Sequence, residues 1–207
     1  MRCINRCKCV LIGDAAVGKT SIVKSLIGKP HAFPINYTMT TGVEIFRKSL
    51  RQPNSENVLE FFIYDFSGKS VYADLVRKIW SNNVTVIVGV FDVSREESFF
   101  KLQSSLTELL KEISRPEEVV GIILGNKIDL TGRRCVSIED AHQLAKKYKM
   151  RYFDVSAKEN GTLIEEAFQH VTGLWLDQHQ QEGGSKRRSF TTTTTASRSI
   201  HSVGHEK

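Results

Sequence analysis

Gly13-Asp-Ala-Ala-Val-Gly-Lys-Thr20 is the stretch from which the rest of the sequence can be interpreted, because it matches the pattern Gly-x-x-x-x-Gly-Lys-Ser/Thr. The apolar run before it, residues 7–13, predicts a buried strand, and residues 19–27 predict a helix that ends at Gly28. Glycines in such a loop let backbone N–H groups surround phosphate oxygens, and the N-terminus of the helix adds its positive end. The stretch therefore predicts a phosphate-binding loop between a strand and a helix.

Two side chains of this loop have specific expected roles. Lys19 would reach the β- and γ-phosphates, and the Thr20 hydroxyl would ligate Mg²⁺. The expected phosphate-binding residues are Gly13, Asp14, Ala15, Ala16, Val17, Gly18, Lys19, Thr20 and Ser21. The loop by itself does not choose between ATP and GTP.

Asn126-Lys127-Ile128-Asp129 makes that choice, and it follows the apolar run of residues 119–124. The Asp129 carboxylate can accept hydrogen bonds from both N1–H and the 2-amino group of guanine, a pair that adenine does not present. The aliphatic part of Lys127 can lie over the base, and Asn126 can connect this segment to the phosphate-binding loop.

A second segment, after the strand predicted at residues 151–155, supports the same base. Its backbone N–H groups would lie near the guanine O6, and its residues are Ser156, Ala157 and Lys158. Each segment is weak alone, but both at strand ends, in this order, predict a guanine nucleotide.

The magnesium site and the catalytic site are expected around residues 40 and 65–69. Asp65 follows the strand predicted at residues 58–64 and can hold Mg²⁺ through water, and the Gly68 N–H can meet the γ-phosphate. Thr40 is either a second hydroxyl ligand of Mg²⁺ or a threonine that begins the strand predicted at residues 41–50. The residues alone leave both interpretations open.

Strand and helix patterns alternate along the chain. The almost wholly apolar runs at residues 84–91 and 119–124 are typical of parallel strands covered on both faces. Helices are predicted between the strands, the first opened by a capping box of Ser94 and Glu97, the others near Ser137 and Thr162. We expect an α/β fold with one domain, residues 1–181, whose six-stranded, mostly parallel sheet has helices on both faces.

Charge and composition exclude several classes of function. The net charge is +6, and residues 183–207 contribute five basic residues against one acidic residue, which leaves about +2 for the rest. So small a net charge outside the tail argues against nucleic acid as a partner. Residues 182–207, basic and rich in threonine and serine, predict a disordered tail. The four cysteines fit no zinc pattern and indicate a reducing compartment, and we expect neither a secretory leader nor a membrane-spanning helix.

Taken in order over residues 8–176, these segments resemble small GTPases of the Ras superfamily, and the Rab branch most closely. The resemblance implies hydrolysis of GTP to GDP and phosphate with Mg²⁺ held by Thr20, Thr40 and Asp65. Within that branch, residues 37–42, 65–69 and 125–134 resemble the Rab-like members of intraflagellar transport. This implies a location in the cytoplasm and the cilium or flagellum, including its base. The implied partners are a small β-sandwich transport subunit and the peripheral transport complex.

Two departures from the Rab pattern carry further expectations. Lys69 stands where most Ras-like proteins have the glutamine that orients the attacking water. An ammonium donates hydrogen bonds but accepts none, so a catalytic set of Lys69, Gly68 and Lys19 predicts slow intrinsic hydrolysis. The last residues contain no cysteine for prenylation, which predicts no stable membrane anchor.

Three alternatives remain at this stage. The protein could be an interaction subunit with permanently bound nucleotide, which slow nucleotide exchange would indicate. It could be a conventional vesicle-trafficking Rab, which the missing cysteine disfavours. A small nucleoside or shikimate-type kinase would have no use for residues 126–129, and a preference for GDP over ADP would exclude it.

Overall fold

The computed structural model describes residues 3–28, 40–53, 55–66, 83–159 and 161–182. They form one six-stranded sheet in the order β2-β3-β1-β4-β5-β6, in which only the β2–β3 pair is antiparallel. This confirms the predicted α/β fold with a mostly parallel sheet. The strands are β1 (Ile4–Ile12), β2 (Val43–Arg51), β3 (Val58–Phe66), β4 (Val86–Asp92), β5 (Val120–Asn126) and β6 (Arg151–Asp154).

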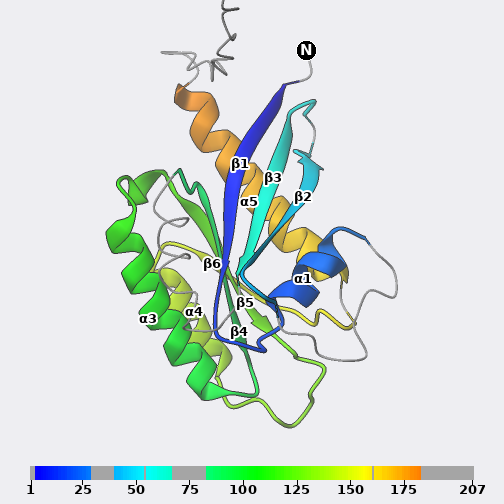
Figure 1. The fold of residues 1–207 in the computed structure, drawn as a ribbon, viewed down its shortest axis with the longest axis vertical. Helices are drawn as coiled ribbons and strands as arrows, with labels where there is room; N and C mark the ends of the chain where they lie inside the picture. Colours follow the sequence, from blue (N-terminus) through cyan, green and yellow to red (C-terminus); the bar gives the residue numbers. More distant parts are fainter. Residues whose placement is uncertain (1–2, 29–39, 54, 67–82, 160, 183–207) are drawn as a thin grey trace, which may run out of the picture.

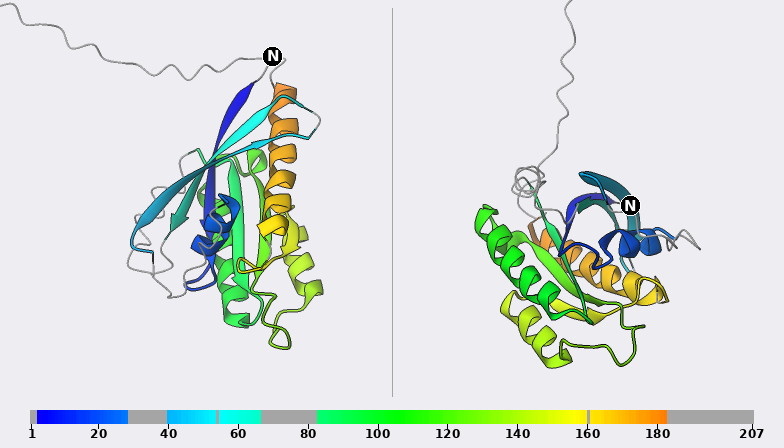
Figure 2. Two further views of the ribbon diagram at one scale, coloured as in Figure 1. Left: turned by 90° about the vertical axis from the view of Figure 1, so that its right-hand side faces the viewer. Right: turned by 60° about the horizontal axis from the view of Figure 1, so that its bottom comes forward.

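Helices cover both faces of this sheet (Figures 1 and 2). One face packs against α1 (Lys19–Leu26) and α5 (Gly161–Glu182), and the other packs against α3 (Glu96–Glu112) and α4 (Ile138–Lys147). A short 3₁₀ helix, η2 (Pro116–Glu118), precedes β5. Side chains of β1 alternate between the two cores, with Leu11 on the α1/α5 side and Val10 on the α3/α4 side. None of the helices in the described part of the chain is long and apolar enough to cross a membrane.

The burial of each strand explains its sequence pattern. Every residue of β4 and β5 is buried, because both strands have neighbours on either side and helices on both faces. Continuous apolar runs therefore suit them. The edge strand β2 instead exposes several of its side chains, including Ile45.

Helix starts agree with the sequence only in part. The Ser137 hydroxyl accepts a hydrogen bond from the Asp140 backbone N–H, as a helix cap should. The prediction that Ser94 caps α3 is wrong, because the helix begins at Glu96 and its first residues receive no side-chain cap. The Ser94 hydroxyl donates to the Asp92 carboxylate at 2.6 Å instead, since a buried charged acceptor makes the stronger bond. α5 includes Gly161 as well as Thr162.

The topology places the expected site at one edge of the sheet. The five strands that run parallel, β1 and β3–β6, all end at this edge. Asp65, Asp92 and Asn126 lie at or beside the carboxyl ends of β3, β4 and β5, and the loop after β1 leads into α1. Ligands of open α/β sheets bind at this edge.

Candidate functional site

The loop of residues 13–18 has a backbone that only certain residues can adopt. Gly13 has φ +147° and Gly18 has φ +98°, both in the region that favours glycine. A Cβ on Gly13 would lie 2.1 Å from the Val90 carbonyl oxygen, and one on Gly18 would lie 2.2 Å from Asn126 Nδ2. The two glycines therefore let the loop pass close to β4 and to the end of β5.

Lys19 is the first residue of α1, and its side chain turns back over this loop. Its Nζ donates to the carbonyl oxygens of Gly13 at 2.9 Å and Asp14 at 2.8 Å. Burial lowers the pKa of Lys19, and the nearby Asp65 and Asp14 carboxylates oppose that shift. The geometry presents a buried amine at the loop where phosphates are expected.

Three oxygen-bearing side chains converge beside the N-terminus of α1. The Thr20 hydroxyl donates to Asp65 Oδ2 at 2.5 Å and lies 2.9 Å from the Thr40 hydroxyl. Asp65 is fully buried, its Oδ1 has no hydrogen-bond partner among the described residues, and burial raises its pKa. Because a buried carboxylate oxygen needs a partner and Mg²⁺ prefers oxygen ligands, this set fits Mg²⁺. Thr40 lies before β2 begins at Val43, which favours its interpretation as a ligand over that of a strand residue.

The segments expected to bind the base are joined to the phosphate-binding loop. Asn126, at the end of β5, is 2% exposed; its Nδ2 donates to the Val17 carbonyl oxygen at 2.8 Å, and its Oδ1 accepts from the Ala157 N–H at 3.0 Å. The Ser156 hydroxyl donates to Asp129 Oδ1 at 2.7 Å. One amide therefore holds three predicted binding segments together, with the Asp129 carboxylate beside them.

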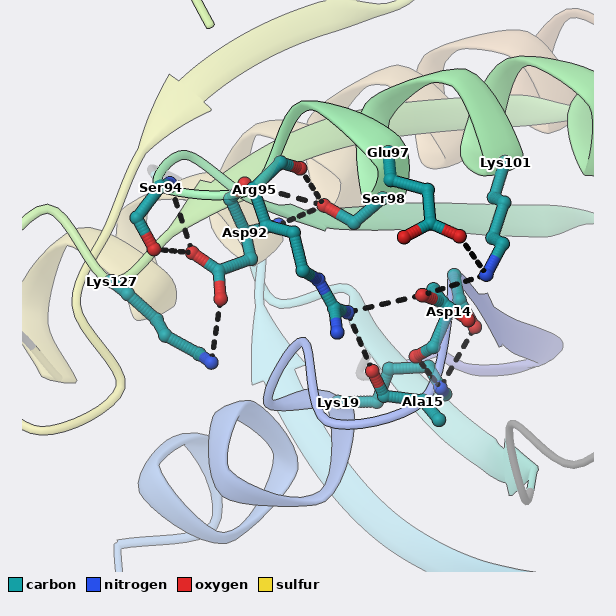
Figure 3. A network of polar contacts seen from close by, with 11 residues as sticks. Asp14, Ala15, Lys19, Asp92, Ser94, Arg95, Glu97, Ser98, Lys101 and Lys127 are labelled. Carbon is teal, nitrogen blue, oxygen red and sulfur yellow. Dashed lines mark hydrogen bonds and ion pairs between the residues drawn. The ribbon is translucent and has the colours of Figure 1, made fainter. Parts of the chain in front are cut away.

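Lys127 has a partner that the sequence did not reveal. Its Nζ forms an ion pair with Asp92 Oδ2 at 2.6 Å, and Asp92 also accepts from the Ser94 hydroxyl and N–H (Figure 3). Burial alone would raise the pKa of Asp92, but these hydrogen bonds lower it below its ordinary value. Sequence reasoning missed Asp92, although its place at the end of the apolar run 84–91 is a usable signal.

Arg95 is the second residue that sequence reasoning missed. Its Nη2 donates to the Ala15 carbonyl oxygen at 2.7 Å and to Asp14 Oδ2 at 3.1 Å (Figure 3). Lys101 of α3 also reaches Asp14 Oδ2, at 3.5 Å. No motif contains these basic residues, and only the fold brings them to the loop.

Gly68, Lys69 and the tail of residues 183–207 lie outside the described residues. Lys158, whose side chain is exposed, donates its backbone N–H to the Ser156 hydroxyl at 3.3 Å, so its backbone lies with the segments expected to bind the base.

A cavity of about 400 Å³ lies between α3 and α4, with Phe100 and Val136 in its lining. None of the predicted nucleotide-binding residues lines it.

Comparisons with known proteins show the family to which the chain is similar. A model of the Ras family matches residues 8–176. The chain is 34% identical over 152 residues to the intraflagellar transport protein 27 homolog of Bos taurus, covering 73% of this chain and 81% of that protein. It is 33% identical over 181 residues to intraflagellar transport protein 27 of Chlamydomonas reinhardtii, covering 86% and 87%. It is also 33% identical over 182 residues to the Ras-related protein Rab-42 of Mus musculus, covering 87% and 82%.

Proposed function

Because this chain belongs to the Ras family of small GTPases, we propose that it binds GTP and GDP with Mg²⁺ as a nucleotide-dependent subunit of intraflagellar transport. The observation that carries the nucleotide assignment is the Asn126 amide, which bonds both Val17 in the phosphate-binding loop and Ala157 in the base segment. A bridge of this kind sets the distance between the phosphate end and the base end of one ligand.

Asp129 is the residue we propose to select guanine. Its Oδ1 accepts from the Ser156 hydroxyl. A carboxylate carries about four acceptor positions, so this bond leaves capacity for N1–H and the 2-amino group of guanine. Adenine would leave the charge without those donors, which is the basis of a strong preference.

Hydrolysis would use the phosphate-binding loop and the Thr20, Thr40 and Asp65 oxygens. Thr20 and Thr40 would bind Mg²⁺ directly and Asp65 through water, and the ion would neutralise charge on the β- and γ-phosphates. Lys19 would contact the same phosphates, and the Gly68 N–H would meet the γ-phosphate. The usual glutamine accepts a hydrogen bond from the attacking water, which the Lys69 ammonium cannot do, so we propose slow intrinsic turnover.

The names of similar proteins support the proposed transport role. The relatives from Bos taurus and Chlamydomonas reinhardtii are both named for intraflagellar transport. We therefore propose a location in the cytoplasm and the cilium or flagellum, and a transport-complex partner that includes the small β-sandwich subunit. The GTPase domain would be residues 1–181, with residues 182–207 as a separate basic tail.

One alternative has an observation in its favour. The likeness to Rab-42 is of similar strength and covers 87% of the chain, so a vesicle-trafficking Rab is the second candidate. Affinity purification from ciliated cells, with the chain loaded with GDP or with a non-hydrolysable GTP analogue, tests both. Recovery of intraflagellar transport proteins supports our proposal, and nucleotide-dependent recovery of vesicle-tethering proteins alone would contradict it. Recovery of the same partners with either nucleotide would indicate an interaction subunit whose partner binding does not depend on nucleotide, and slow nucleotide exchange would then indicate a permanently bound ligand.

A further inference from the structure

Asp14 places a negative charge inside the loop that, on the proposed function, binds a polyanion. Its side chain is 15% exposed, so solvent screens the charge only in part. Burial lowers the pKa of Lys19, and the Asp14 carboxylate is close enough to act against that shift. A carboxylate that influences the phosphate-binding lysine would also repel phosphate unless another group neutralised it.

Arg95 is placed to neutralise it. Its Nη2 bonds Asp14 Oδ2 at 3.1 Å and the Ala15 carbonyl oxygen at 2.7 Å, so one guanidinium holds two adjacent residues of the loop. Lys101 lies farther from the carboxylate, at 3.5 Å, and its Nζ is closer to Glu97, at 2.7 Å. Arg95 is therefore the main cationic partner of Asp14 in the described part of the chain.

The backbone of Arg95 is fixed by the turn between β4 and α3. Its N–H donates to the Asp92 carbonyl oxygen at 3.0 Å, and its own carbonyl oxygen accepts from the Ser98 hydroxyl at 2.7 Å. Ser98 is fully buried and also accepts from the Asp92 N–H at 3.0 Å. The same turn carries the Asp92 carboxylate that binds Lys127, as Figure 3 shows. The turn thus connects the base segment to the outer side of the phosphate-binding loop.

We propose that Arg95 is a positioning residue for nucleotide binding: it neutralises Asp14 and holds the Ala15 carbonyl so that the loop accepts a polyphosphate. This inference rests on the proposed function, because it assumes that a guanine nucleotide is the ligand. It requires that Arg95 slows nucleotide release, and that its importance depends on the charge of Asp14.

Release of a fluorescent GDP into excess unlabelled GDP tests both requirements in the full chain. Loss of a charge-assisted bond predicts about tenfold faster release for Arg95→Ala. Arg95→Lys should restore part of the wild-type rate, because an ammonium can reach one of the two acceptors. Lys111→Ala, which removes an exposed cation at the other end of α3, should release GDP at the wild-type rate.

The decisive variant combines Arg95→Ala with Asp14→Asn. If Arg95 acts by neutralising Asp14, the double variant releases GDP more slowly than Arg95→Ala alone. If Arg95 has only a structural role, adding Asp14→Asn should make GDP release faster still. Thermal unfolding of each protein reports whether it is folded, and Arg95→Gln replaces Arg95→Ala throughout if the alanine variant does not fold. The inference is overturned if Arg95→Ala, or Arg95→Gln where it is used instead, leaves the rate of GDP release unchanged. It is also overturned if adding Asp14→Asn does not slow GDP release relative to the Arg95 variant alone. Failure of the wild-type chain to bind GDP is a different result, which overturns the proposed function as well.

Discussion

Gly13 shows at the residue scale how strictly the phosphate-binding loop is constrained. It combines a positive φ with a close approach to β4, and each would disfavour a side chain. Asp65 is constrained differently, because its buried carboxylate has an oxygen that no described group satisfies. The Gly-x-x-x-x-Gly-Lys-Thr pattern predicted Gly13 as a site residue, and the end of the predicted strand at residues 58–64 predicted Asp65.

Replacing Gly13 by alanine should destabilise the protein by at least about 3 kcal/mol, because backbone strain and a steric clash with Val90 act together. The matched control is Gly132→Ala, since Gly132 also has a positive φ, +78°, but has nothing within 4 Å of the added Cβ. That change should cost only about 1–2 kcal/mol. Urea unfolding measures both free energies. Equal losses in the two variants would show that the approach to Val90 does not matter.

Lys69 determines the expected rate of hydrolysis. Single-turnover phosphate release from purified protein should be no faster than about 10⁻⁴ s⁻¹, because the lysine ammonium cannot accept a hydrogen bond from the attacking water and so cannot orient it. Lys69→Gln should be as fast as the wild type or faster. A markedly faster wild type, or a slower glutamine variant, would mean that lysine contributes to the chemical step or that another residue positions the water.

At the scale of helices and strands, the sequence predicted the strands more accurately than it predicted the starts of helices or the contacts between loops. The runs 84–91 and 119–124 predicted β4 and β5 closely, because burial on both faces leaves a signal that is local in the sequence. The start of α3 was wrong because the Ser94 hydroxyl has a buried acidic partner in Asp92, which a capping rule does not consider. The bond from Arg95 to Asp14 joins residues 81 positions apart, so no local pattern could predict it.

The connection between β4 and the base segment predicts a dependence on pH. Because hydrogen bonds from Lys127 and Ser94 outweigh burial and lower the pKa of Asp92, its pairing stabilises the protein above the ordinary carboxyl pKa. This stabilisation is lost as the pH falls through the lowered pKa. The free energy of unfolding should therefore be higher for wild type than for Asp92→Asn at pH 7, and the difference should shrink towards pH 3. Urea unfolding at both pH values checks this, and a difference that grows on acidification would contradict it.

The whole molecule brings together loops that are distant in the sequence because its parallel strands end at one edge. Sequence order was therefore enough to predict that residues 13–20, 65, 126–129 and 156–158 would meet. The contacts that hold these segments together depend on side-chain packing and could not be predicted, as the Lys127–Asp92 ion pair shows. The role predicted for residues 68–69 in hydrolysis stays a prediction, because these residues lie outside the described part of the chain.

Binding of Mg²⁺ and GDP should stabilise the whole folded chain, since the unfolded chain has no site. A ligand at a thousandfold excess over its Kd adds about 4 kcal/mol, which corresponds to a rise of roughly 10 °C in Tm for a domain of this size. Mg²⁺ with ADP is the matched control and should leave Tm nearly unchanged. Removal of Mg²⁺ with a chelator should reduce the rise seen with GDP. Equal shifts with ADP would argue for a nucleotide site without guanine selection.

Guanine selection by Asp129 is the central claim, and one comparison tests it most directly: binding of GDP and xanthosine diphosphate to wild type and to Asp129→Asn. Asparagine keeps the acceptor for the Ser156 hydroxyl, but it replaces the second carboxylate oxygen with a donor. Asp177→Asn is the matched control, on the exposed side of α5. We predict that Asp129→Asn lowers the affinity for GDP about a hundredfold or more and raises that for xanthosine diphosphate. Unchanged GDP affinity in Asp129→Asn would contradict the account.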